Sequence, residues 1–151
     1  MSDLVDAWQR HARIQLYLLD ALVGAALDAP GPRGRTVGHQ FSHIHDVRRM
    51  WLESAAPDLL PGVEKLGKAP VSDRATIRTS LERSAAAIGE LVARAELGGR
   101  VKGFKPSPTA FVGYLISHES YHQGDIGVRL TESGYPLDKK TSFGMWEWGV
   151  R

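Results

Sequence analysis

Cysteine is absent from the 151-residue sequence, which rules out disulfide bonds and thiolate metal ligands. A metal ion would therefore have to be held by nitrogen and oxygen ligands. Long apolar runs are also missing, since none approaches the roughly 18 residues that a membrane span needs. The first residues, MSDLVDAWQRH, place acids and a histidine where a signal peptide has a positive start and an apolar stretch. We expect a soluble, cytoplasmic protein that does not contact a membrane.

Neither sign of charge dominates the sequence. Lysine and arginine total 19 against 17 aspartates and glutamates, a net charge of +2. The basic residues are mixed with acids and form no single-sign stripe, so we expect no nucleic-acid partner. The length favours one domain over residues 1–151. Hydrophobic residues make up 42% of the chain, enough for a core in a domain that buries about 68–70% of its unfolded surface.

Four segments repeat apolar residues every three or four positions, and none alternates convincingly as a strand would. The predicted helices cover about residues 3–27, 37–54, 73–97 and 108–133, and their expected N-caps are Ser2, Thr36, Ser72 and Ser107. This pattern predicts an all-α fold, an up-down four-helix bundle, with long connections over residues 55–72 and 98–106. Residues 135–151 form an irregular C-terminal tail. Because the tail holds two of the four tryptophans, we expect it to pack on the bundle or on a second copy in a homodimer.

Two histidines occupy core positions of the last predicted helix. Its apolar stripe is Phe111, Leu115, His118, His122 and Ile126. Side chains four residues apart on a helix lie about 5–6 Å from each other on one face. Two buried imidazoles without partners are costly, and a shared cation removes that cost because neutral imidazole is the ligand form. A single histidine here would be explained as a hydrogen-bonded core residue, whereas the pair favours a metal site.

The second predicted helix supplies the third ligand candidate. Its apolar stripe is Phe41, Ile44, Val47 and Trp51. His43 lies beside this stripe and is the expected third ligand, while His39, one turn earlier, is an alternative ligand or a proton carrier. His45 is expected to face away. His45 and His11 are interpreted as half-exposed polar residues, although His11 lies on the first helix's stripe and could reach the site.

The segment from His118 to His122 also matches H-E-x-x-H, the zinc metallopeptidase motif, in which Glu119 would be the general base. No further histidine follows at the metzincin spacing, and no edge strand is evident to hold an extended peptide. Glu119 therefore remains a candidate base or proton carrier at a metal, with a solvated helix charge as the equal alternative.

The stretches TVGHQFSHIHDVRRMWLE and YLISHESYHQGDIGVRLTESGYP resemble the DinB/YfiT-like family of four-helix-bundle metalloproteins. The resemblance places the family's ligands on His43, His118 and His122. Gly124 and Ile126 keep the family pattern, whereas Gln123 and Asp125 replace its usual basic residue and amide. Gly124 is interpreted as a close-packing point between helices. Asp125 is either an acceptor behind a ligand or an exposed charge. The resemblance implies metal-dependent hydrolases and thiol-dependent transferases or isomerases.

Three neutral histidines and an open position are typical of a catalytic zinc site. Zinc or nickel is the expected divalent ion, and iron and manganese are also compatible. We expect a metal-dependent hydrolase or thiol-dependent transferase that acts on a small-molecule substrate. The alternative is a bundle that binds a metal or a ligand without catalysis.

Overall fold

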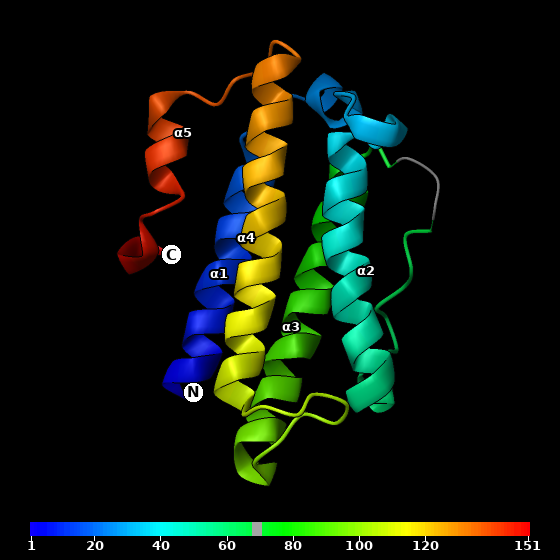
Figure 1. Cartoon of the computed structure of the whole chain (residues 1–151), viewed down its shortest axis with the longest axis vertical. Helices are drawn as coiled ribbons and strands as arrows, with labels where there is room; N and C mark the ends of the chain where they lie inside the picture. Colours follow the sequence, from blue (N-terminus) through cyan, green and yellow to red (C-terminus); the bar gives the residue numbers. More distant parts are fainter. Residues whose placement is uncertain (68–70) are drawn as a thin grey trace.

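The computed structural model describes residues 1–67 and 71–151 and confirms the all-α class. Four long helices form a bundle, and a short helix follows them (Figure 1). The helices are α1 Asp3–Asp20, α2 Val37–Ala55, α3 Arg74–Gly98, α4 Pro108–Glu132 and α5 Lys139–Gly144. The 3-10 turns are η1 Gly24–Asp28, η2 Pro32–Gly34, η3 Pro57–Leu59 and η4 Trp148–Val150. Among the described residues, β-structure is limited to an isolated bridge between Val101 and Phe104, and no helix is long and apolar enough to cross a membrane.

The starts of the long helices follow the predicted caps with one correction. The side chains of Ser2, Thr36 and Ser107 accept hydrogen bonds from backbone N–H groups in the first turns of α1, α2 and α4. Asp73 caps α3 in place of the predicted Ser72, because the Ser72 hydroxyl donates to Asp28 instead.

Helix α1 ends at Asp20, earlier than the predicted end near residue 27. The chain then forms η1, where Ala26 and Leu27 are fully buried. The apolar residues that suggested a longer helix therefore belong to a separate turn that joins the core at the end of the bundle.

The long helices do not alternate in direction along the chain, which corrects the predicted up-down order. Gly38 near the start of α2 lies against Val71, just before α3. Further along the same pair of helices, Arg48 donates to the carbonyl oxygen of Leu81 at 3.0 Å. α2 and α3 are therefore parallel, and α1 and α4 run the other way (Figure 1). The connection between α2 and α3, of which residues 68–70 lie outside the described part, brings the chain back along the bundle as a long crossover.

The core consists of two apolar ends separated by a polar level. One end includes Trp8, Leu52, Ile88 and Phe111, and the other includes Leu18, Phe41, Ile77 and Ile126. On every long helix, buried polar side chains fall between these two sets, and they include His11, Gln15, Arg48, Ser84 and Glu119. Burying polar groups is costly unless they are paired, so the polar level requires an explanation that the apolar ends do not.

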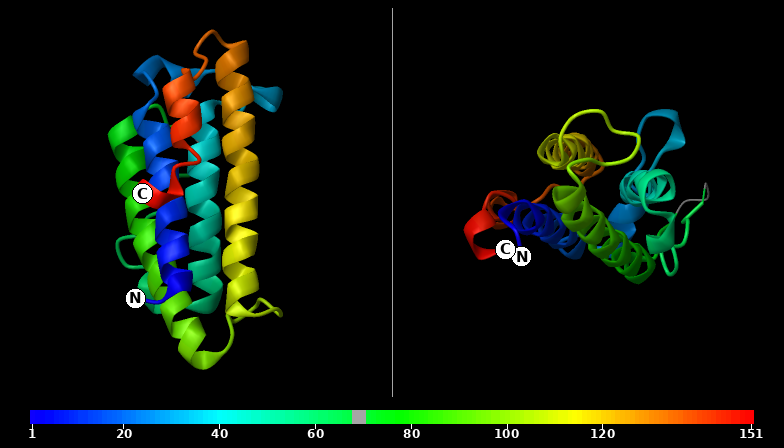
Figure 2. Two further views of the ribbon diagram at one scale, coloured as in Figure 1. Left: turned by 90° about the vertical axis from the view of Figure 1, so that its left-hand side faces the viewer. Right: turned by 90° about the horizontal axis from the view of Figure 1, so that it is seen from below.

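The C-terminal tail folds back beside α1 (Figures 1 and 2). Nη1 of Arg10 donates to the carbonyl oxygens of Trp148 at 2.6 Å and Arg151 at 2.9 Å. The Arg151 guanidinium lies 3.8 Å from the centroid of the Tyr17 ring. The tail, predicted as irregular, thus contains α5 and η4 and packs on the bundle.

Candidate metal centre

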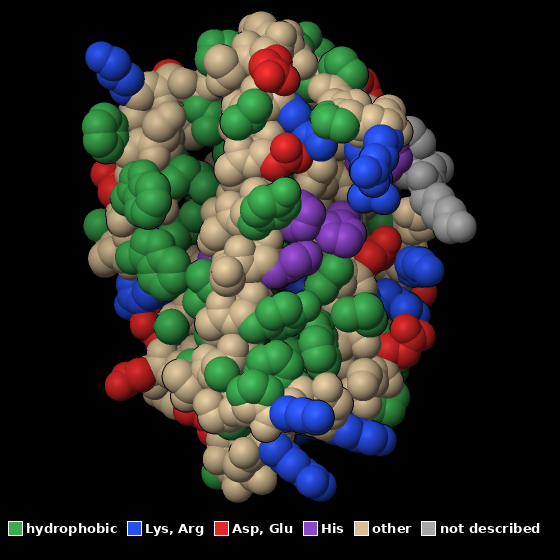
Figure 3. Space-filling model, viewed as in Figure 1, with side chains coloured by type: hydrophobic (Ala, Val, Ile, Leu, Met, Phe, Trp, Pro, Cys, Tyr) green, Lys and Arg blue, Asp and Glu red, His purple; other side chains and the backbone are tan. Residues whose placement is uncertain are grey.

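Three histidines converge between helices α2 and α4, partway along the bundle. His43 lies on α2, and His118 and His122 lie one turn apart on α4. One ring nitrogen of each lies within 4.8 Å of the others. All three side chains are partly buried, and histidine side chains reach the surface together over α2 and α4 (Figure 3). The structure therefore brings together the three residues that the sequence predicts as ligands.

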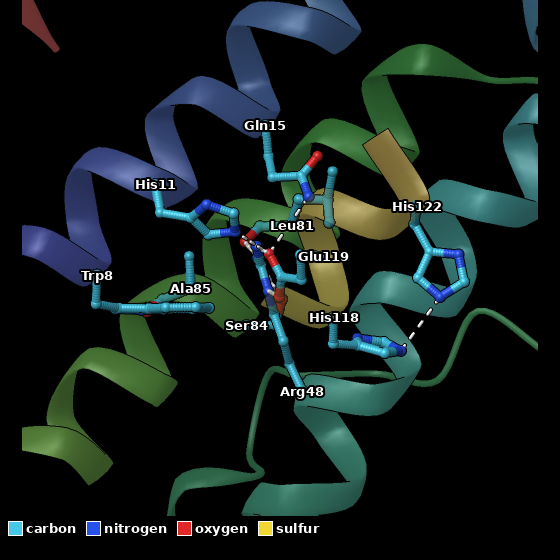
Figure 4. A network of polar contacts seen from close by, with 10 residues as sticks. All are labelled: Trp8, His11, Gln15, Arg48, Leu81, Ser84, Ala85, His118, Glu119 and His122. Carbon is cyan, nitrogen blue, oxygen red and sulfur yellow. Dashed lines mark hydrogen bonds and ion pairs between the residues drawn. The ribbon is translucent and has the colours of Figure 1, made fainter. Parts of the chain in front are cut away.

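The spacing of the rings suits one ion. Nε2 of His118 lies 3.2 Å from Nε2 of His122 (Figure 4). Two nitrogens bound to one tetrahedral zinc at about 2.0–2.1 Å would be about 3.3 Å apart. A hydrogen bond between the two rings gives a similar distance, but it does not explain the third ring. The centroid of His43 lies 4.6 Å from that of His122 and 5.4 Å from that of His118, so three donors surround a common point.

Gln40 orients one of these rings. Its Oε1 lies 2.7 Å from Nδ1 of His122, and an amide oxygen only accepts, so Nδ1 carries the proton. Neutral His122 then presents an unprotonated Nε2 toward His118. Metal-binding histidines commonly donate their second N–H in this way. Sequence reasoning missed Gln40, although its position three residues before His43 places it on the same face of α2.

Burial and mutual proximity keep the three rings neutral. Burial lowers the pKa of His118 below its ordinary value. Burial also lowers the pKa of His43, and the nearby His118 and Arg35 lower it further. For His122, burial together with the neighbouring His43 and His118 lowers the pKa to about 4. The cluster therefore offers lone pairs rather than charges near neutral pH, as metal binding requires.

Glu119 follows His118 in the sequence but points to the other side of α4, into the bundle (Figure 4). Its Oε1 accepts from Nε of Arg48 at 2.6 Å, and its Oε2 accepts from Nη2 of Arg48 at 2.7 Å. Nε2 of His11 lies 2.8 Å from the same Oε2. Burial alone raises the pKa of Glu119, but the charge and hydrogen bonds of Arg48, with help from His11, lower it to about 2. This environment does not favour the hypothesis that Glu119 is a base at the metal, because the carboxylate is turned away from the histidines and already paired.

Arg48 is the partner of Glu119 that sequence reasoning missed. Its Nη1 donates to the carbonyl of Leu81, and its Cζ lies 5.0 Å from the centroid of the Trp8 ring. The sequence did contain a signal for this position. Arg48 lies four residues from both Ile44 and Leu52, so it shares a helix face with these two apolar residues. The structure buries these three residues, while Val47 and Trp51 of the predicted stripe are only partly buried.

The remaining histidines have structural partners. Nδ1 of His39 accepts from the backbone N–H of Thr36 at 3.0 Å and completes a capping box at the start of α2. His11 and His45, predicted to be half-exposed, are both buried. His11 meets Glu119, and Nε2 of His45, predicted to face away, donates to the carbonyl of Glu64 at 2.7 Å.

Of the residues after His122, Gly124 differs from expectation. Gly124 is exposed, and a Cβ atom added there meets nothing within 4 Å. The predicted close packing at Gly124 is therefore wrong. Asp125 accepts from Nε of Arg129 at 2.6 Å, an ion pair one turn along α4.

Aromatic side chains border the histidine cluster. The ring of Tyr114 stacks near His118, with centroids 6.2 Å apart and an interplanar angle of 24°. Tyr114 also contacts Trp51 and Phe104, at centroid distances of 5.8 Å and 5.7 Å. These three rings are partly buried, so apolar surface lies next to the ring nitrogens.

The arrangement is that of a helical bundle with a three-histidine candidate metal centre between two of its helices. The model of the DinB family matches residues 1–141, and the chain belongs to this family. Comparisons with curated proteins and with solved structures gave no significant match.

Proposed function

We propose that this DinB-family protein binds one divalent metal ion through His43, His118 and His122 and uses it to act on a small molecule. The observation that supports this proposal is the convergence of three uncharged ring nitrogens within 4.8 Å of one another at a partly exposed place. Nitrogen donors of this kind suit zinc or nickel, and also iron or manganese. Three protein ligands leave coordination positions free for a substrate or water.

We propose a metal-dependent hydrolase or a thiol-dependent transferase as the activity. A metal bound by three protein ligands polarises a carbonyl group or lowers the pKa of a bound water or thiol. Gln40 holds the ring of His122 through its Nδ1 proton, which keeps Nε2 available as a donor. The rings of Tyr114, Trp51 and Phe104 offer contact to an apolar part of the substrate.

A metallopeptidase mechanism built on H-E-x-x-H finds little support in the geometry. It needs Glu119 as a base beside the metal-bound water, and the carboxylate of Glu119 instead accepts two hydrogen bonds from Arg48. The same observation favours the second candidate, a metal-binding bundle without catalysis, because it removes the one glutamate that the motif offers as a base. Entry of an added thiol into the coordination sphere of the bound metal would separate the two, since a purely structural site is closed to exogenous ligands.

The metal assignment is tested by measuring metal content after dialysis for the wild type, His118→Ala and a matched control, His39→Ala. His118→Ala is expected to lose most of its metal while remaining folded, because it removes one donor from a partly exposed site. His39→Ala removes a histidine of the same region that takes part only in helix capping, so it should keep its metal and lose about 1 kcal/mol of stability or less. Equal metal content in His118→Ala and the wild type would defeat the assignment.

A further inference from the structure

A second candidate site lies on a different side of α4 from the histidine cluster. A cavity of about 640 Å³, partly open to solvent, lies between α1, α4 and the C-terminal tail. Its apolar lining includes Ile14, Leu18, Ile116, Leu137, Met145 and Trp148. None of the three clustered histidines lines it. A molecule in this cavity would therefore not contact an ion held by those histidines.

The lining of the cavity indicates an uncharged guest. No lysine, arginine, aspartate or glutamate lines it among the described residues. Transfer of an ionised group into such surroundings without a counter-charge is costly. The volume falls within the range of about 300–1,000 Å³ that is usual for small-molecule pockets.

One side of the cavity carries polar groups. His11 is 1% exposed, and because its Nε2 is engaged with Glu119, Nδ1 is the ring nitrogen left for a ligand. Ser120 contributes a hydroxyl and Gln123 an amide. The amide nitrogen of Gln123 is buried and has no hydrogen-bond partner in the described part of the chain. A ligand with one hydrogen-bonding group at this side would supply the missing partner.

We propose that this cavity binds a neutral, mostly apolar small molecule whose single hydroxyl or carbonyl group meets His11, Ser120 and Gln123. The site goes beyond the proposed metal-dependent function and does not depend on it. A small molecule fits better than a second copy of the chain, because the protein's own tail already forms one wall of the cavity. That wall is held in place by Arg10, which donates to the carbonyl oxygens of Trp148 and Arg151.

The test is isothermal titration calorimetry of the purified protein with 1-naphthol, a neutral aromatic molecule with one hydroxyl group. We expect saturable binding at one site. Gly124→Leu should weaken it roughly ten-fold or more, since the new side chain enters the cavity from a helical position with open space around its Cβ. Gly113→Leu is the matched control, because Gly113 is an exposed position of the same helix, also has open space and does not line the cavity. It should leave the affinity unchanged.

Two further measurements identify the occupant. 1-Naphthoate, which carries a charge, should bind roughly ten-fold more weakly than 1-naphthol or worse. Removal of bound metal with a chelator should not change the affinity for 1-naphthol, which distinguishes this site from the histidine cluster. The proposal is overturned if 1-naphthol does not bind, if Gly124→Leu binds it normally, if 1-naphthoate binds as tightly, or if binding disappears with the metal. Trp146 of the tail lines the cavity and is 81% exposed. The proposal is also overturned if light scattering shows a dimer that Trp146→Ser dissociates while 1-naphthol fails to bind, because the tail would then be an interface between copies.

Discussion

Two polar clusters lie on different faces of α4, and they differ in how their hydrogen-bonding groups are satisfied. Glu119 is 1% exposed and its two oxygens are held by Arg48 and His11. His118 and His122 are partly exposed, and their Nε2 atoms face each other at 3.2 Å. The carboxylate of the first cluster is thus paired within the protein, although Oε1 of the neighbouring Gln15 is buried without a partner among the described residues. The second presents several lone pairs to one point, an arrangement that an electron-pair acceptor would complete.

The comparison separates the residues of the H-E-x-x-H segment into two roles. The two histidines belong to the cluster for which we propose metal binding, whereas the glutamate between them belongs to the polar level that joins α1, α2 and α4. A buried ion pair of this kind is costly to break even where it contributes little net stability. The paired carboxylate of Glu119 thus indicates a structural role. The ring nitrogens of the histidines, whose lone pairs face one another, indicate a role in binding a metal ion.

The largest expected effect is on folding and comes from the Glu119 cluster. Glu119→Gln removes the negative charge beside the fully buried Arg48 guanidinium. Removal of one partner from a buried pair typically costs about 3–5 kcal/mol, so the free energy of unfolding should fall by about that amount. Urea denaturation followed by circular dichroism measures it. Folded Glu119→Gln should still bind metal with the wild-type stoichiometry, because Glu119 is not a ligand, and the large loss of stability is the result that a catalytic-base role alone would not predict.

The control for this prediction is an exposed ion pair of α2. Arg49 and Glu53 are 3.4 Å apart, and the Glu53 side chain is 59% exposed. Glu53→Gln should change stability by less than about 1 kcal/mol. If the two variants lost similar amounts of stability, the distinction between the buried and exposed pairs would be wrong.

The histidine cluster could be predicted because helical period alone decides which side chains share a face. His118 and His122 replace apolar residues on the stripe of α4, and His43 adjoins the stripe of α2. The position of Glu119 could not be predicted in the same way. A residue about 100° around the helix from His118 faces either solvent or another helix, and only its partner on α2 decides which.

The stripe of α2 illustrates the same limit. Apolar spacing favours Val47 and Trp51 as core positions, yet the structure buries Arg48 and Leu52 more deeply. A hydrophobicity pattern assigns an arginine to the surface. Only the structure shows that Glu119 faces Arg48 and allows it to be buried. The direction of α3 was also beyond prediction, because a connection rich in glycine and proline carries no signal for the end of the bundle at which the next helix starts.

Lowering the pH should affect the two clusters at different pH values. Because the pKa values of His43 and His118 lie below 6.5 and that of His122 is about 4, protons should compete with the metal only below pH 6.5, and the metal should be lost as the pH approaches 4. Each lowered histidine pKa also means that stability present above pH 6.5 declines as the pH falls. The lowered pKa of Glu119 contributes stability above 4.5 that is lost only as the pH falls toward 2.

Metal content and circular dichroism should therefore change at different pH values. We expect a range near pH 4 in which the metal has left but the Glu119–Arg48 pair is still ionised and the helices persist. Ultrafiltration with metal analysis, beside circular dichroism on the same samples, tests this order. Release of the metal near pH 6.5, or simultaneous loss of metal and helical structure, would contradict this order.

The smallest expected effect concerns Gln40, whose side-chain oxygen accepts a hydrogen bond from His122 of the histidine cluster. Gln40→Leu removes the acceptor for Nδ1 of His122 and should weaken metal binding by roughly 10–100-fold, as is usual for residues behind a ligand. Gln40→Glu keeps an acceptor oxygen at that position and should retain most of the affinity. Both can be measured by competition with a chromophoric chelator. Equal weakening by the two substitutions would mean that the packing of Gln40, which is 6% exposed, matters rather than its hydrogen bond. Gln40 would then belong with Glu119 among the groups that hold the bundle together.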